Sequence, residues 1–167
     1  MSTNPFVGTW RLVSNETIEA SGEVRHPFGK DATGYVIYNE DGYVTFTIMG
    51  PDRNRFASAD MRAGSLEDKR AAFDTYFAYL GTYEVKGDKV VHHVELSLFP
   101  NWIGGEQERF FQFSGDQLEL RTPPLALGGA ARTLRIVWQR VKPRVAPTSP
   151  FMSAPLEKPG QATDRTR

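Results

Sequence analysis

The sequence predicts an all-β fold, an antiparallel up-and-down barrel of about eight to nine strands with one mid-chain helix capping the barrel. Two observations predict it. Apolar and polar residues alternate with a period of two in most segments of residues 8–141, and Gly/Asp dipeptides that favour tight turns separate neighbouring segments. The segments follow one another as hairpins, and closing the sheet removes its exposed edges, so a closed barrel is favoured over an open sheet.

The first strand is predicted over residues 8–20, with one face buried and the other exposed. The alternation places Trp10, Leu12, Ser14 and Ile18 on one face and Arg11, Asn15 and Thr17 on the other. A short second strand is predicted near residues 24–28.

Three hairpins are predicted next. They span residues 35–49, 81–98 and 108–122, with turns at Asp41-Gly42, Gly87-Asp88 and Gly115-Asp116. The glycine of each dipeptide can adopt the positive φ that a two-residue turn requires. A loop rich in Pro and Gly over residues 123–131 then leads to the last predicted strand, over residues 132–141.

One segment, residues 65–80, departs from the strand pattern and is predicted to be a helix. Ser65 lies three residues before Asp68, a spacing close to that of a capping box. Four apolar residues fall near one helical face, namely Leu66, Phe73, Phe77 and Leu80. A helix at this place in the chain would be either a plain plug in the barrel mouth or a lid over a ligand.

The composition of the 167 residues limits the classes of function. The 20 basic and 20 acidic residues balance, so neither a nucleic-acid backbone nor a membrane is an expected partner. Cysteine is absent, which excludes thiol chemistry, and we find neither a leader-like N-terminus nor a membrane-spanning apolar run. We expect a cytoplasmic protein with one domain over residues 1–141. Repeated Pro and no apolar periodicity predict a disordered tail over residues 142–167.

The strands around the turn FPNWIGGE carry most of the polar residues that could bear chemistry. The predicted antiparallel pairs are Ser97 with Gln107, Glu95 with Arg109 and His93 with Phe111. In this register the six residues share one face of the sheet, and His92 lies on the opposite, mainly aliphatic face. The adjacent histidines therefore point apart and cannot bind one metal ion together.

Two interpretations of this hairpin stay open. In the first, the aliphatic face lines the interior, Glu95 and Arg109 form an exposed pair, and His92 is a hydrogen-bonded core residue. In the second, the polar face lines a cavity and orients a carboxylate or carbonyl group of a ligand. The ligand-binding residues predicted by the second interpretation are Tyr35, Tyr83, Glu95, Ser97, Trp102, Gln107 and Arg109.

Metal and cofactor chemistry is not indicated. The three histidines, at positions 26, 92 and 93, lack the spacing of a zinc or haem site on one element, so no metal and no cofactor is expected. Acid–base chemistry is an alternative, because a carboxyl group in a dry pocket can share a proton with a nearby imidazole. The candidate catalytic residues are Glu95, His93, His92 and Arg109.

Four segments together resemble the lipocalin-like domain family of bacteria and fungi, over roughly residues 5–141. They are VGTWRLVS near the N-terminus, GTYEV, HHVELSLFPNWIGGEQERF and LELRTPP. The resemblance implies a small barrel with an internal cavity, used to carry small apolar molecules and, in some relatives, to cyclise or isomerise them. It also implies that Trp10 and Arg140 are structural, with the guanidinium stacked on the indole at the base of the barrel.

We therefore predict binding of a small, largely apolar molecule in a barrel cavity with an Arg/Glu polar anchor. The alternative is a cofactor-independent cyclase, isomerase or dehydratase that uses a Glu/His acid–base pair in the same cavity, with Arg109 stabilising an enolate. A third alternative is a filled barrel that acts only through its surface. The sequence predicts neither the identity of the ligand nor the oligomeric state.

Overall fold

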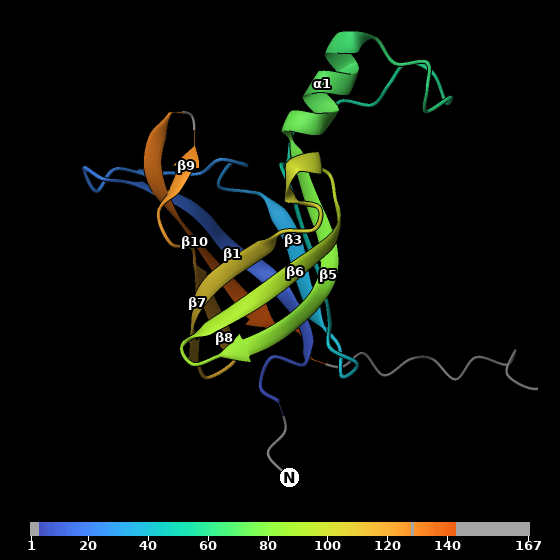
Figure 1. The fold of residues 1–167 in the computed structure, drawn as a ribbon. Coiled ribbons are helices and arrows are strands. Elements are labelled where there is room, and N and C mark those ends of the chain that lie inside the picture. The colour runs from blue at the N-terminus through green and yellow to red at the C-terminus, as the bar shows by residue number, and fades with distance from the viewer. Residues whose placement is uncertain (1–3, 128, 143–167) are drawn as a thin grey trace, which may run out of the picture.

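The computed structural model describes residues 4–127 and 129–142. Within them, eight antiparallel strands close a barrel (Figure 1), which confirms the predicted fold class. In chain order these strands are β1 (Gly8–Glu19), β3 (Thr33–Tyr38), β4 (Tyr43–Met49), β5 (Tyr76–Lys86), β6 (Lys89–Ser97), β7 (Glu106–Ser114), β8 (Gln117–Arg121) and β10 (Ala130–Arg140). Two short strands extend the sheet, β2 (Val24–Arg25) beside β1 and β9 (Leu125–Leu127) beside β10. Of the tail predicted over residues 142–167, only residue 142 belongs to the described residues, and residues 143–167 lie outside them.

The barrel closes because the first and last of its strands pair. β1 is hydrogen-bonded to β3 on one side and to β10 on the other, and the other barrel strands follow in chain order. The predicted turns are present, and Gly42, Gly87 and Gly115 have φ values of 85°, 62° and 59°. These values lie in the left-handed region that glycine adopts without steric cost.

The face pattern of β1 differs from the prediction beyond Leu12. A bulge between Leu12 and Ser14 shifts the pairing with β10, and Asn15 then lies opposite the buried Ile136. Asn15 and Thr17 are consequently buried at 3% and 6% exposure, although strict alternation placed them on the outer face. A bulge adds one residue to a strand and so exchanges its two faces from that point onward.

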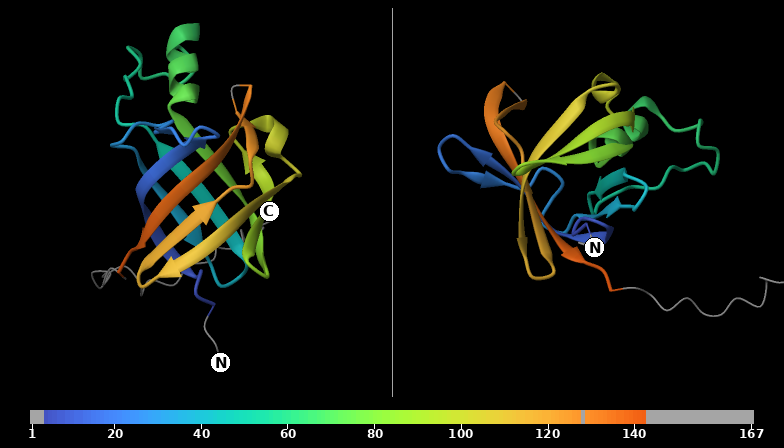
Figure 2. Two further views of the ribbon diagram at one scale, coloured as in Figure 1. Left: turned by 90° about the vertical axis from the view of Figure 1, so that its left-hand side faces the viewer. Right: turned by 60° about the horizontal axis from the view of Figure 1, so that its bottom comes forward.

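The base of the barrel contains the predicted stack of an arginine on a tryptophan. The guanidinium carbon of Arg140 lies 4.0 Å from the ring centroid of Trp10. Arg140 also donates hydrogen bonds to the carbonyl oxygens of Val7 (2.9 Å) and Pro5 (2.6 Å). The indole nitrogen of Trp10 donates to the carbonyl oxygen of Phe6 at 2.8 Å. These contacts fix the N-terminal segment across the end of the barrel that lies opposite the helix (Figure 2).

The mid-chain helix is shorter than predicted. α1 spans Leu66–Asp74 and begins with the expected capping box, in which the Ser65 hydroxyl accepts from the Asp68 amide and the Asp68 carboxylate accepts from Ser65. Residues 76–80, predicted to be helical, instead begin β5 and pair with β4. Helical periodicity of a few aromatic residues does not outweigh a complete ladder of interstrand hydrogen bonds.

The helix is not a plug. No residue of α1 is buried, and Leu66 and Phe73 are 88% and 46% exposed. Figure 1 shows it projecting from the end of the barrel at which β5 begins. Among the described residues, no helix is long and apolar enough to cross a membrane.

The predicted register of the hairpin β6–β7 is wrong. Arg109 lies opposite Val90, and His92 lies opposite Gln107, so the partners are displaced by five positions from the prediction. The main-chain hairpin closes where Val94 exchanges hydrogen bonds with Gly104 and Gly105 (2.8 and 2.9 Å). Residues 95–103 therefore lie beyond the β6–β7 ladder and form an excursion between the two strands. This excursion contains the single-turn helix η1 (Pro100–Trp102). An odd displacement exchanges the faces of β7 relative to β6, and Arg109 turns inward while Glu95 does not.

Candidate ligand site inside the barrel

Three side chains from three strands meet inside the barrel. Nε2 of His92 on β6 lies 2.9 Å from the hydroxyl oxygen of Tyr38 on β3, and Nδ1 lies 2.6 Å from that of Tyr79 on β5. All three residues are buried, with exposures of 0%, 1% and 3% respectively. We call Tyr38, His92 and Tyr79 the Tyr–His–Tyr trio. Both ring nitrogens of the buried imidazole have a partner in it.

Burial keeps this trio uncharged at neutral pH. It lowers the pKa of His92 well below the usual 6.5, and the nearby charge of Arg109 lowers that pKa further. Burial raises the pKa of Tyr79 to about 12 and also raises the pKa of Tyr38 well above 10. A neutral imidazole has one N–H, so one tyrosine hydroxyl donates to its bare nitrogen and the other accepts from its N–H.

Arg109 is buried next to the trio and has no acidic partner among the described residues. It is 3% exposed, and it lies opposite Val90, whose side chain is in the core. Its Nη1 donates to the carbonyl oxygen of Glu108 (2.8 Å) and its Nη2 to Oε1 of Gln107 (3.4 Å), whereas Nε has no acceptor among the described residues. The Glu108 carboxylate instead pairs with Lys89 at 2.8 Å. Burying a guanidinium without a carboxylate costs free energy, and a bound ligand oxygen would offset this cost.

A small pocket connects Arg109 to the open end of the barrel. Its volume is about 50 Å³, and its lining is mainly apolar. Its aromatic and aliphatic walls are Phe28, Phe46, Ile48, Phe77, Trp102, Leu134 and Ile136. Trp102 packs edge-to-face on Phe77 with a centroid separation of 4.9 Å. The pocket therefore combines an aromatic wall with one buried cation.

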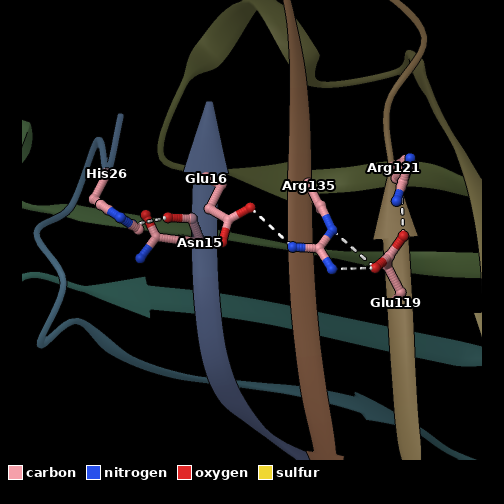
Figure 3. A network of polar contacts seen from close by, with 6 residues as sticks. All are labelled: Asn15, Glu16, His26, Glu119, Arg121 and Arg135. Atoms are coloured by element: carbon pink, nitrogen blue, oxygen red, sulfur yellow. Dashed lines mark hydrogen bonds and ion pairs between the residues drawn. The ribbon is translucent and has the colours of Figure 1, made fainter. Parts of the chain in front are cut away.

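The loop over residues 26–29, which contributes Pro27 and Phe28 to the pocket lining, is fixed to β1 (Figure 3). The Asn15 side chain donates to the carbonyl oxygen of Gly29 at 3.3 Å and accepts from the amide of Phe28 at 3.4 Å. Nδ1 of His26 lies 2.9 Å from the Asn15 carbonyl oxygen. The loop places Phe28 in the pocket wall, so the bulge that turned Asn15 inward also shapes the mouth.

An ion-pair network ties three strands together beside this loop (Figure 3). Arg135 on β10 contacts Glu16 on β1 at 3.0 Å and Glu119 on β8 at 2.7 Å, and Glu119 also pairs with Arg121. The hydrogen bonds from Arg121 and Arg135 hold the pKa of Glu119 below its usual value despite partial burial. Glu16 is the one acidic residue in the pocket lining, and its carboxylate is engaged by Arg135.

Wider hollows also lie on the outside of the barrel, including one at each end. One, of about 610 Å³, lies between α1 and the loop at residues 52–61. The other, of about 540 Å³, lies at the base around Phe6, Tyr83 and Phe113. Neither contains a buried unpaired polar group of the described residues, whereas the interior pocket contains Nε of Arg109. The interior is therefore the candidate site.

The structure brings together only part of the predicted site. Arg109, Gln107 and Trp102 lie at the interior pocket or contact a residue that lines it. His92 is buried beside them, and as predicted it points away from His93, which lies on the outer face 2.8 Å from Glu84. The interpretation that placed the aliphatic face and a hydrogen-bonded His92 inside is therefore right for His92 and Val94, but wrong for Leu96, which is 64% exposed, and for the exposed pair of Glu95 with Arg109.

The remaining predicted residues lie elsewhere. Glu95 is exposed and does not pair with Arg109, because the register differs from the predicted one. Tyr35 is 44% exposed on the outer face of β3. Tyr83 lies at the base, where its hydroxyl accepts from Asn4 at 2.9 Å. Ser97 ends β6, where its backbone is the register partner of Tyr79 on β5.

The sequence offered six tyrosines as possible hydroxyl donors to a pocket, but the predicted site residues include neither tyrosine of the trio. Tyr38 could have been found, because it alternates with Val36 on the buried face of β3. Tyr79 could not, because its segment was assigned to the helix. Trp138, whose indole nitrogen is buried without a partner among the described residues, was also not singled out.

Comparison with known proteins agrees with this architecture. The family model described as "Lipocalin-like domain" matches residues 7–141. The chain is also similar to a protein of Aspergillus oryzae named 4'-hydroxy-3'-methoxypropiophenone carrier protein ppsC, with 33% identity over 103 residues. That match covers 56% of this chain and 93% of the relative. On the strength of its closed barrel and of these matches, the chain belongs to the lipocalin-like domain family.

Proposed function

We propose that the protein binds a small, largely apolar molecule inside the barrel, with Arg109 contacting an oxygen atom of that molecule. The observation that carries this proposal is a guanidinium that is 3% exposed and has no carboxylate partner among the described residues. A ligand oxygen that accepts from its free Nε–H would complete its hydrogen bonding. Of the predicted Arg/Glu anchor, we therefore propose only the arginine, because Glu95 is exposed on the outside of the barrel.

The chemistry of the pocket and the name of the fungal relative support an aromatic ligand. Phe46, Phe77 and Trp102 offer ring faces and edges on which an aromatic ring can pack. The relative is named for carrying 4'-hydroxy-3'-methoxypropiophenone, a phenol that also bears a ketone. We therefore take an oxygenated aromatic ketone as the model ligand.

Binding requires the mouth of the barrel to open. A pocket of about 50 Å³ holds only a few water-sized groups, whereas small-molecule sites usually measure about 300 Å³ or more. The parts best suited to move are Phe28, whose stretch of the loop is held to Asn15 by hydrogen bonds of 3.3 and 3.4 Å, and the excursion with Trp102. Displacing Phe28 and Trp102 would join the pocket to solvent and expose Arg109 to the ligand.

The enzymatic alternative is less well supported by the geometry. The predicted Glu/His pair is not formed in the interior, because Glu95 is exposed and His93 pairs with Glu84 on the outer face. The interior does contain His92, but both of its nitrogens are engaged by tyrosines. We therefore propose binding as the function of the cavity.

Titration with 4'-hydroxy-3'-methoxypropiophenone, followed by isothermal calorimetry and by NMR of backbone amides, tests this proposal. We expect saturable one-to-one binding, with the largest amide shifts in residues around Trp102, Phe28 and Arg109. Replacing Arg109 by Met, which preserves much of the apolar stem, should weaken binding about 10- to 100-fold through loss of charge-assisted hydrogen bonds.

Arg121→Met is the matched control. Arg121 lies on the outer face of β8 with its side chain half-exposed, so its loss should leave affinity unchanged. Amide shifts confined to the outer hollows, or equal affinities of the Arg109→Met and wild-type proteins, would contradict the proposal.

A further inference from the structure

We propose that the interior site takes its ligand as an oxyanion, so that a molecule with an acidic hydroxyl, such as a phenol conjugated to a ketone, binds as its phenolate. This inference rests on the proposed binding function and specifies the chemical class of the ligand. It is carried by an excess of hydrogen-bond donors over acceptors inside the barrel, together with a buried positive charge.

The first two surplus donors are N–H groups. Nε of Arg109 and Nε1 of Trp138 are both buried, and neither has an acceptor among the described residues. Trp138 is fully buried and packs against Phe46, which is a wall of the pocket. Both unsatisfied groups are donors, so any group that satisfies either of them has to be an acceptor.

The Tyr–His–Tyr trio supplies a third surplus donor in either tautomer. The trio has two hydroxyl hydrogens and one imidazole N–H, but only two hydrogen bonds connect its members. The tyrosine that accepts from the imidazole keeps its own O–H free. If Nδ1 carries the proton, the free hydroxyl is that of Tyr79, whose ring lies 5.8 Å from the ring of Trp102 in the pocket wall.

The fixed charge inside the barrel is also unbalanced. Arg109 is positively charged, the trio is neutral, and Glu16, the acidic residue in the described pocket lining, is held by Arg135 at 3.0 Å. An anion placed against the guanidinium in a poorly solvated interior is stabilised far more than the corresponding neutral hydroxyl. A neutral hydroxyl would also bring a fourth donor to a site that already lacks acceptors. The proton that the phenol loses passes to the solvent, so binding should release one proton when the free ligand is neutral.

The experiment compares two aromatic ketones with the wild-type protein. The first is 4'-hydroxy-3'-methoxypropiophenone, whose phenolate absorbs at longer wavelength than its phenol. The second is 3',4'-dimethoxypropiophenone, which has nearly the same shape and cannot ionise. We expect the pKa of the bound phenol, read from its absorbance, to be about one to three pH units below that of the free compound. We also expect the dimethoxy compound to bind at least tenfold more weakly at pH 8.

Two variants assign the effect to the guanidinium. In Arg109→Gln, the pKa of the bound phenol should no longer be lowered. The two compounds should then bind this variant with affinities similar to each other. Arg109→Lys, which keeps a positive charge, should retain part of the shift. If Arg109→Gln does not fold, the comparison of the two compounds with the wild-type protein still decides the matter.

The outcomes separate the two proposals. If both compounds bind equally well and the bound phenol titrates like the free one, the site takes neutral ligands, and the oxyanion inference is wrong while the binding function stands. If neither compound binds, the proposed binding of aromatic ketones fails as well.

Discussion

Nδ1 of His92 lies 2.6 Å from the hydroxyl oxygen of Tyr79, and the opposite nitrogen of the same ring lies 2.9 Å from that of Tyr38. A histidine in the centre of this barrel is thus satisfied by two phenols from different strands. Its neighbour His93 lies outside, between the carboxylates of Glu84 and Glu106. Adjacent residues of one strand therefore have separate roles, and their variants should behave differently.

Replacing His92 by Leu should destabilise the protein by about 2–4 kcal/mol, because two buried tyrosine hydroxyls lose their shared partner. Urea unfolding at pH 7 measures this change. The control is His93→Leu, which removes only half-exposed contacts with the carboxylates of Glu84 and Glu106 and should cost no more than about 1 kcal/mol. Equal losses in the two variants would show that the trio contributes nothing specific.

The stability of the protein should decrease as the pH falls from about 6.5 to 5. The folded protein keeps His92 neutral because its pKa is depressed, whereas the unfolded chain takes up a proton near the ordinary histidine pKa. The unfolded state then binds more protons, and the free energy of unfolding should drop by about 1.4 kcal/mol per pH unit once the pH is below about 6.5.

The contribution of His92 is full above this window and is lost progressively below it. Unfolding in urea at pH 7, 6 and 5 should show the slope in the wild-type protein and a much smaller slope in His92→Gln. Carboxylates with lowered pKa values, such as that of Glu119, reduce the free energy of unfolding only when they are protonated at lower pH. An unchanged slope in His92→Gln would place the pH dependence elsewhere.

Gly81→Ala should be among the most damaging single-methyl additions to the chain. A bulge between Leu80 and Gly81 brings the carbonyl oxygen of His93 to within 1.8 Å of where the new Cβ would lie. The backbone would have to move, at a cost of about 3 kcal/mol or more. Gly87→Ala is the matched control, because no atom of the described residues lies within 4 Å of the new Cβ and only the φ of 62° is strained, which should cost about 1 kcal/mol. Thermal unfolding of the two variants compares these costs.

Arg140→Met should lower the free energy of unfolding by about 2–4 kcal/mol. The substitution removes the stack on Trp10 and two hydrogen bonds to carbonyl oxygens of the N-terminal segment. Hydrogen exchange should increase most at Val7 and its neighbours, since that segment loses its attachment to the base. Arg11→Met, on the exposed face of β1, should change stability by less than about 0.5 kcal/mol. Ligand affinity should change little in both variants, because the base lies at the opposite end from the pocket.

The sequence by itself determined the class of fold, the order of the hairpins and the positions of their turns. Alternation on β3, the three Gly-containing turns and the order of the hairpins need only local information, because side chains of a strand alternate and few residues allow a positive φ. The stack of Arg140 on Trp10 also followed from the resemblance alone, and it is present.

Only the tertiary structure decided which polar residues face the interior. The bulge after Leu12 turned Asn15 inward, and the excursion over residues 95–103 set the register that buries Arg109 and exposes Glu95. The physical reason is that a strand has a period of two, so an odd slip exchanges its faces, and such slips are fixed by packing and hydrogen bonds between strands far apart in the chain. The same long-range pairing converted residues 76–80 from a predicted helix into β5 and so brought Tyr79 to His92.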